Sequence, residues 1–514
     1  MKKFLKRFGH LITGTLACFD RLLLRGSIRQ LGYEDGLASW MSWKGILLKD
    51  FAERTEQFTA RLKKHAQDYA ARAGRPYKYL ESPSESKEKL VEELLAKDKV
   101  TDGLVCVLSA VELGKSYEIR RNRDTKHLEL RRKTRPCQFF YFYFIDREFG
   151  LMHVRLQSWL PFDIQICLNG REWLARLMDK EGLSYDRRDN CFASLQDPKR
   201  AQELADSMLD TDWVKVCNHF AKRVNPLLQD ILKESNYYWT VRQGEYATDV
   251  MFRDAEALAE VYPHLVHHAT TSFGSEKVMR FLGQKLHGNF TGEVTTRPTR
   301  RPEGVCVKHT VCENSIKMYD KQGSVLRIET TINNARRFKV RRRLVRNGKQ
   351  VVGWYPMRKG VIDMRRRVEL SRAANARYLK ALATIPESRP AHKTLDPVSV
   401  PVITPTQRYR ALRPISTEDA ILFASVMRGE FILNGFRNAE IRALLFPQPT
   451  EDPREKRRRG SRITRLLRLL SAHGLVQKLQ GTSRYLVTTR GVEVMSTALH
   501  VRTADVTGPR KKRA

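Results

Sequence analysis

Four carboxylates in two strand-like segments could together hold a divalent metal ion. Glu245 and Asp249 lie four residues apart, so they share a face whether their segment is a strand or a helix. Asp320 and Glu329 lie on either side of a short turn that contains glycine. Mg²⁺ and Mn²⁺ suit oxygen ligands, and such ions offset the charge that develops at phosphorus during phosphoryl transfer. The sequence therefore predicts that Glu245, Asp249, Asp320 and Glu329 are candidate metal ligands.

The same carboxylates admit a purely structural interpretation. Glu245 and Asp249 could solvate the edge of a sheet or pair with Arg242. Arg327 and Glu329 share a strand face and could form an ordinary ion pair, which contributes little when it is exposed. No cofactor is certain from the sequence, and Mg²⁺ or Mn²⁺ is expected only if the protein is an enzyme.

Residues 306–333 are expected to form a hairpin that carries further polar groups. Strand alternation places Lys317, Tyr319 and Lys321 on one face and Asp320 on the other. The order Tyr-Asp-Lys, a short turn and Leu-Arg-Ile-Glu resembles a pattern in the replication-initiation proteins of phages and rolling-circle plasmids. Those enzymes nick one DNA strand with a tyrosine, assisted by a divalent metal that histidines and carboxylates hold.

This resemblance implies metal or structural roles for Asp320 and Glu329, and it places Lys317 and Lys321 near phosphate. The nucleophile would be Tyr319, or Tyr378 on a downstream helix. The family's paired histidines around one bulky apolar residue have no counterpart in this sequence. Tyr319 could instead be a core aromatic whose hydroxyl lies at the rim.

The last hundred residues carry a second pattern. Residues 457–473 predict one basic amphipathic helix, with Ile463, Leu466, Leu467 and Leu470 on its apolar stripe and Gly474 as its stop. Two short extended runs follow, joined by Gln-Gly-Thr-Ser, which is typical of a hairpin. This order resembles the recognition helix and wing of winged-helix DNA-binding domains. The resemblance implies that the following residues contact DNA: Arg462, Arg465 and Arg468 in or beside a major groove, Thr464 at a base edge, and Arg484 with Tyr485 in the wing.

Charge supports a polyanionic partner. The 514-residue chain has a formal net charge of +37, which attracts nucleic acid. The most basic run, 336–346, predicts a non-specific backbone contact through Arg337, Lys339, Arg341, Arg342 and Arg343, although a solvated connector has the same composition. No run approaches the roughly 18 apolar residues of a membrane span, so no membrane partner is expected. Eight scattered cysteines predict reduced, packed thiols and a cytoplasmic protein.

The predicted fold class is α+β, with several domains and a mixed or antiparallel sheet in the body. Residues 1–130 are expected to form an N-terminal α/β region, and 131–385 a central α+β domain with strand hairpins. A proline-rich linker at 386–414, a winged helix at 415–500 and a basic tail at 501–514 would complete the chain. The sequence shows no internal repeat.

Three functions fit these patterns. The first is a bacterial, mobile-element type of DNA-binding protein, which reads double-stranded DNA through the winged helix and could form a homodimer. The second is a metal-dependent DNA-nicking endonuclease related to replication initiators. The third is a ligand-responsive transcriptional regulator, which would usually be smaller and less cationic. Basic binding does not distinguish single-stranded DNA or RNA from duplex DNA in the N-terminal body.

Overall fold

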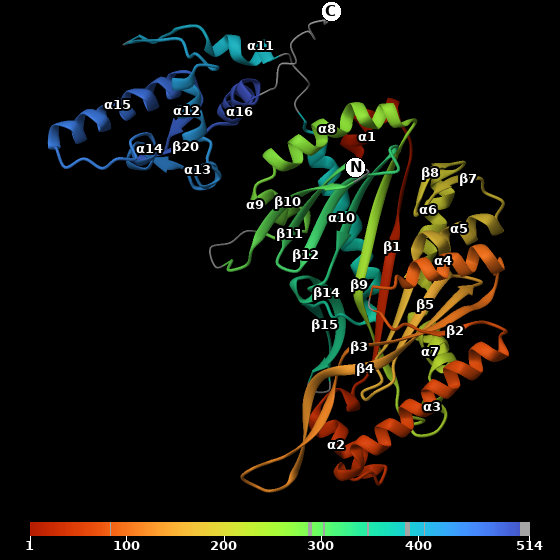
Figure 1. Ribbon diagram of the computed structural model, residues 1–514. Helices are drawn as coiled ribbons and strands as arrows, with labels where there is room; N and C mark the ends of the chain where they lie inside the picture. Colours follow the sequence, from red (N-terminus) through yellow and green to blue (C-terminus); the bar gives the residue numbers. More distant parts are fainter. Residues whose placement is uncertain are drawn as a thin grey trace, which may run out of the picture. The chain divides into compact units, whose positions relative to one another are not determined.

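The computed structural model describes residues 1–82, 84–285, 290–301, 304–346, 349–385, 391–405 and 407–503. It has the predicted α+β fold class and divides into two compact units, Met1–Ile385 and Pro386–Ala514 (Figure 1). The boundary predicted at residue 130 is wrong, because β4 (Leu128–Asp146) crosses it and pairs along its length with β3 (Gly103–Arg121). None of the helices in the described ranges is both long enough and apolar enough to cross a membrane.

The first unit is built on one sheet with the strand order β10-β11-β12-β13-β9-β1-β6-β5-β4-β3-β2. Its other strands are β1 (Ile12–Ile28), β2 (Tyr77–Tyr79), β5 (Gly150–Gln157), β6 (Ile164–Asn169), β9 (Tyr237–Phe252), β10 (Val294–Arg301), β11 (Gly304–Val311), β12 (Asn314–Lys321) and β13 (Val325–Thr331). Neighbouring strands are antiparallel except for the pair β2 and β3. The sheet is therefore mixed, and its two longest central strands, β1 and β9, lie side by side.

The order of the strands repeats within the sheet. The meander β3-β4-β5-β6 ends beside β1, and the meander β10-β11-β12-β13 ends beside β9. The two halves meet where β1 and β9 pair antiparallel. No repeat is visible in the sequence, because the repeat lies in the pairing order and the two halves use different residues.

Helices cover one face of the sheet in both halves. In the first half, α3 (Phe51–Arg72) and α7 (Trp213–Val224) share an apolar core with residues such as Phe142 and Phe144. In the second half the cover consists of α8 (Ala255–Thr271), α9 (Ser275–Phe281) and α10 (Met364–Leu382). Alternation along β13 turns Leu326 and Ile328 toward this core, so Arg327 and Glu329 point to the other face.

The opposite face is covered near the centre by a small hairpin of β7 (Tyr185–Arg188) and β8 (Cys191–Leu195). Strand β8 packs against β1, β9 and β13. The remaining helices of this unit are α1 (Lys2–Phe8), α2 (Glu34–Trp43), α4 (Lys87–Asp98), α5 (Gly170–Lys180) and α6 (Pro198–Ser207). A separate two-stranded hairpin joins β14 (Lys339–Arg346) to β15 (Lys349–Pro356).

The second unit has its own apolar core. Its elements are α11 (Ala391–Leu395), β16 (Val402–Ile403), β17 (Arg408–Tyr409), α12 (Thr417–Val426), α13 (Gly429–Asn434), β18 (Phe436–Arg437), α14 (Asn438–Leu445), α15 (Pro453–Ala472), β19 (Val476–Lys478), β20 (Arg484–Val487) and α16 (Thr489–Thr503). Leu395 and Leu412 belong to this core, so the predicted linker contributes to the unit. Residues 386–390 of that linker and 504–514 of the predicted tail lie outside the described residues.

Candidate functional site

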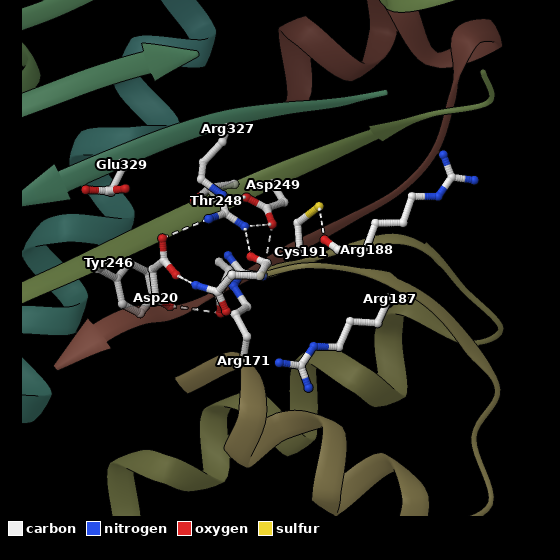
Figure 2. Close-up of polar contacts among 12 residues, drawn as sticks. Asp20, Arg171, Arg187, Arg188, Cys191, Tyr246, Thr248, Asp249, Arg327 and Glu329 are labelled. Carbon is white, nitrogen blue, oxygen red and sulfur yellow. Dashed lines mark hydrogen bonds and ion pairs between the residues drawn. The ribbon is translucent and has the colours of Figure 1, made fainter. Parts of the chain in front are cut away.

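Two arginines and two aspartates are buried at the centre of the sheet (Figure 2). Asp249 on β9 lies directly opposite Arg327 on β13 and accepts two hydrogen bonds from it, from Nε at 2.8 Å and from Nη2 at 2.9 Å. Nη1 of Arg327 donates to Asp20 at 2.8 Å, and Nη2 also donates to the carbonyl oxygen of Asn190 at 2.7 Å. Arg327 thus joins β13 to three other segments of the chain.

A second buried arginine completes this group. Nη1 of Arg171 lies 3.0 Å from Asp249 Oδ2, and both side chains are 0% exposed. Arg171 is the second residue of α5, where Asn169 caps the helix by accepting hydrogen bonds from two backbone amides. A Cβ atom at Gly170 would come within 2.3 Å of the Phe19 carbonyl oxygen. Glycine is therefore required for α5 to begin so close to β1.

The charges in this group stabilise one another. Burial lowers the pKa of the Arg327 guanidinium, but the neighbouring Asp249 and Asp20 carboxylates outweigh burial and hold this pKa well above its ordinary value. For Arg171 the same balance, with Asp249 as the main partner, also raises the pKa. Both arginines are consequently charged at neutral pH.

A bulge in β1 aims Asp20 at this group. The pairing of β1 with β9 runs from Phe19 opposite Tyr246 to Leu22 opposite Gly244, so two residues of β1 face one residue of β9. Phe19 and Leu22 are both buried in the helix-covered core. Asp20 lies between them and turns to the other face, where it meets Glu245 and Glu329.

Three carboxylates converge beside the buried arginines. One oxygen each of Asp20, Glu245 and Glu329 lies within 4.8 Å of the others. Strand pairing explains part of this, because Glu329 lies opposite Ala247 and Glu245 is two residues from Ala247 on the same face. Oxygens at this spacing could surround one divalent cation.

Glu329 is the most constrained of the three. Its Oε2 accepts a hydrogen bond of 2.9 Å from the Tyr319 hydroxyl. Its Oε1 lies 2.7 Å from Nζ of Lys317, as an ion pair without the alignment of a hydrogen bond. Burial raises the pKa of Glu329 despite Lys317, and the charges of Glu245 and Asp20 raise it further. A cation at this position would favour the ionised carboxylate.

The structure brings together only part of the predicted metal set. Glu245 and Glu329 meet, whereas Asp249 is engaged by the two buried arginines. Asp320 does not join them, because it lies on the other face and accepts a hydrogen bond from the Gly323 amide in the turn. Lys321 pairs with Asp189 at 2.6 Å.

Tyr378 is also separated from the carboxylates. It lies on α10 in the helix-covered core, is 0% exposed, and its hydroxyl bonds His309 Nε2 at 2.9 Å. The prediction that Tyr378 is a nucleophile is therefore wrong, because no substrate reaches a fully buried hydroxyl. Tyr319 is the predicted tyrosine that lies beside the cluster.

Sequence reasoning missed Asp20 and Arg171. Asp20 and the adjacent Arg21 interrupt an apolar run, with Leu-Ala-Cys-Phe before them and Leu-Leu-Leu after them. An acidic residue within an otherwise apolar strand is a usable signal, because a buried carboxylate needs a partner. Arg171 gives no such signal, since it lies in an ordinary amphipathic helix.

Three of the predicted DNA-contacting residues of the second unit are exposed, and the other three are engaged in contacts within that unit. Arg462, Arg465 and Arg468 are exposed on α15, whereas Ile463, Leu467 and Leu470 are buried beneath them. Thr464 turns inward, where its hydroxyl donates to the Gly460 carbonyl oxygen and accepts from Asn438 Nδ2. Arg484 donates to the Gly435 carbonyl oxygen, and Tyr485 stacks on Phe436.

The predicted basic run forms β14 and the short turn before it. Arg337, Lys339, Arg341 and Arg343 are exposed, and Arg342 pairs with Asp363.

Comparison of the chain with family models, curated proteins and solved structures finds no match. The two family resemblances therefore stay predictions.

We expect Arg327→Met to lower the free energy of unfolding by about 3–5 kcal/mol, since it leaves two buried carboxylates without their shared partner. All seven tryptophans lie in the first unit, so urea unfolding followed by tryptophan fluorescence reports on that unit. The control is Arg365→Met, which removes a surface ion pair with Asp210 and should cost less than about 1 kcal/mol. Equal destabilisation of the two variants would contradict the role assigned to Arg327.

Proposed function

We propose that the protein binds DNA and reads duplex DNA through a winged helix at residues 415–500. The observation that carries this proposal is α15, which is anchored by a buried apolar side and presents Arg462, Arg465 and Arg468 to solvent. Apart from the short helix α13 between α12 and β18, the order α12, β18, α14, α15, β19 and β20, with sheet order β18-β20-β19, is the order expected for a winged helix. In such a domain the recognition helix enters the major groove and the turn between the last two strands forms the wing.

The strongly basic composition supports the same proposal. A net charge of +37 supplies a sequence-independent attraction to phosphate and speeds encounter with DNA. All eight cysteines are free thiols, which fits the cytoplasm, where DNA is accessible. By its resemblance to replication initiators, the protein would be of the kind that bacterial mobile elements encode.

The triple variant Arg462→Ala/Arg465→Ala/Arg468→Ala should weaken duplex binding and flatten its salt dependence. Each phosphate that is no longer neutralised should reduce the slope of log K against log salt by about 0.9. Fluorescence anisotropy at several salt concentrations measures both quantities. The matched control removes three exposed arginines of α3, Arg54, Arg61 and Arg72, and changes net charge equally. Equal effects of the two triple variants would contradict a recognition role for α15.

A second candidate function is metal-dependent nicking of a DNA strand. It is favoured by the convergence of Asp20, Glu245 and Glu329 with the Tyr319 hydroxyl. A divalent cation held by the three carboxylates would polarise a phosphoryl oxygen. Glu329, which already accepts the hydrogen bond of Tyr319, is placed to take the phenolic proton. Lys317 would stabilise charge on the phosphate.

The bond changes of this reaction balance without any further reactant. The Tyr319 oxygen would attack phosphorus, and a phosphotyrosine bond would form as the bond from phosphorus to the 3′ oxygen breaks. The phenolic proton would pass to Glu329 and from there, relayed by water, to the departing 3′ oxygen. Burial raises the pKa of Tyr319, and the adjacent Glu329 carboxylate raises it further, so a base and a metal are both needed to form the phenolate.

We expect Mn²⁺-dependent cleavage of single-stranded DNA by the full chain, with a covalent protein–DNA adduct detected on denaturing gels. Tyr319→Phe should abolish the adduct, and Glu245→Gln should lower cleavage by at least about a hundredfold, as loss of metal ligation implies. Tyr378→Phe is the matched control, because it removes a tyrosine hydroxyl that lies in the core. An adduct that persists in Tyr319→Phe would reject the nicking function, as would the absence of cleavage with both Mg²⁺ and Mn²⁺. Either result would leave the proposed DNA binding in place.

Metal binding should depend on pH through Glu329. Because the pKa of this carboxyl is raised, a proton occupies it at low pH and competes with the cation. Affinity for Mn²⁺ should therefore rise as pH increases through that pKa and then level off. Glu329→Gln should bind more weakly and lose this dependence. Mn²⁺ titrations followed by electron paramagnetic resonance measure the effect, and an affinity independent of pH in the wild type would contradict it.

A further inference from the structure

The hairpin of β14 and β15 has one face that combines positive charge with an exposed tryptophan. Cross-strand pairs place Arg341 beside Trp354 and Arg343 beside Val352, and the same face continues through Lys339. All of these side chains are exposed, with 59% of the Trp354 surface accessible. In the part of the chain that the structure describes, neither Arg341 nor Arg343 has an ion-pair partner.

The other face fixes the hairpin to the body of the first unit. Arg342 pairs with Asp363, whose carboxylate also accepts a hydrogen bond from the Arg358 amide at 2.8 Å. Val340 packs against a small core of Ile332, Ala335, Phe338 and Met357. These contacts anchor the hairpin from one side, and the arginine- and tryptophan-bearing face is exposed.

Trp354 is held by a neighbouring cation as well as by the strand. The Arg366 guanidinium lies over its ring, 5.6 Å from the centroid, and is itself fixed by the Lys339 carbonyl oxygen and by Glu369. Such a contact orients the ring but leaves most of it accessible. An exposed indole on a narrow hairpin is unfavourable in water, so a ligand that covers it would gain apolar burial.

The chemistry of this face fits an unpaired nucleic-acid strand. Every base has a flat π surface that can stack on an indole once it is free of its helix. Arg341 and Arg343, two residues apart on the strand beside Trp354, can hold the neighbouring phosphates. A duplex offers only its end to such a ring. An apolar peptide would bury the tryptophan but would leave Arg341 and Arg343 without a counter-charge.

We propose that the outward face of this hairpin binds single-stranded DNA, with a base stacked on Trp354 and the phosphates held by Arg341, Arg343 and Lys339. This inference rests on the proposed DNA binding and deepens it, because it names a second substrate form and a second contact surface. It does not depend on α15, which serves the duplex. It also does not depend on cleavage.

The test uses the full chain with a fluorescent oligothymidylate and with a duplex that has blunt ends. Trp354→Ala should weaken oligothymidylate binding by about 5- to 100-fold, the effect of removing one stacking platform, and Trp354→Phe by less. Arg341→Gln/Arg343→Gln should weaken it too and flatten its salt dependence by about 0.7 for each phosphate that is no longer neutralised. Duplex affinity should change less than oligothymidylate affinity in each variant.

Trp43→Ala is the matched control, because Trp43 is also 59% exposed and also has a cation over its ring, Lys44 Nζ at 4.1 Å. This control should leave oligothymidylate affinity unchanged. If Trp354→Ala behaves like Trp43→Ala while α15 still binds duplex, the hairpin proposal is overturned and the proposed function stands. If the wild type binds neither form at low salt, both fail. If oligouridylate binds more tightly than oligothymidylate through Trp354, the assignment to DNA is overturned.

Discussion

The buried contact between Arg327 and Asp249 constrains the centre of this protein. Removing an ion from water costs several kcal/mol, and the cost is recovered only when partners lie in good geometry. Here β9, β13, β1, α5 and the turn at Asn190 all contribute to one charged group. A slip of one residue between β9 and β13 would turn Arg327 into the apolar core beneath α10. The charged group therefore specifies the register of the central strands.

Arg327 also helps to position the cluster of three carboxylates. Asp20 accepts a hydrogen bond from Arg327 and also lies in the cluster with Glu245 and Glu329. The arginine therefore fixes the position of one of the three carboxylates. The three carboxylates have Lys317 as a neighbouring cation, and their mutual repulsion is part of what raises the pKa of Glu329. A divalent cation would relieve that repulsion more fully than a proton shared with one carboxylate.

Local patterns predicted from the sequence describe the pieces of this site better than their assembly. Strand alternation correctly grouped Arg327 with Glu329 and Glu245 with Asp249, and Gly474 has the left-handed φ of 73° expected at a helix stop. The same alternation placed Asp320 on the face opposite to Tyr319. Strand alternation therefore already argued against Asp320 as a metal ligand. The sequence could flag Asp20 as a buried carboxylate but could not place it beside Glu245 and Glu329, because that position depends on a bulge and on pairing with a strand over two hundred residues away. A hydrophobic pattern does not encode that pairing.

The repeated strand order explains why the carboxylate cluster forms where the two halves of the sheet meet. In the first half, the corresponding strands β5 and β6 place His153 opposite Cys167. That face is covered by α4, and burial lowers the pKa of His153 to about 4, so the imidazole is neutral and packed. The two halves thus share topology but differ in the charge that this face carries. Because Asp20 comes from β1 and Glu245 and Glu329 come from β9 and β13, neither half alone could assemble the carboxylate trio.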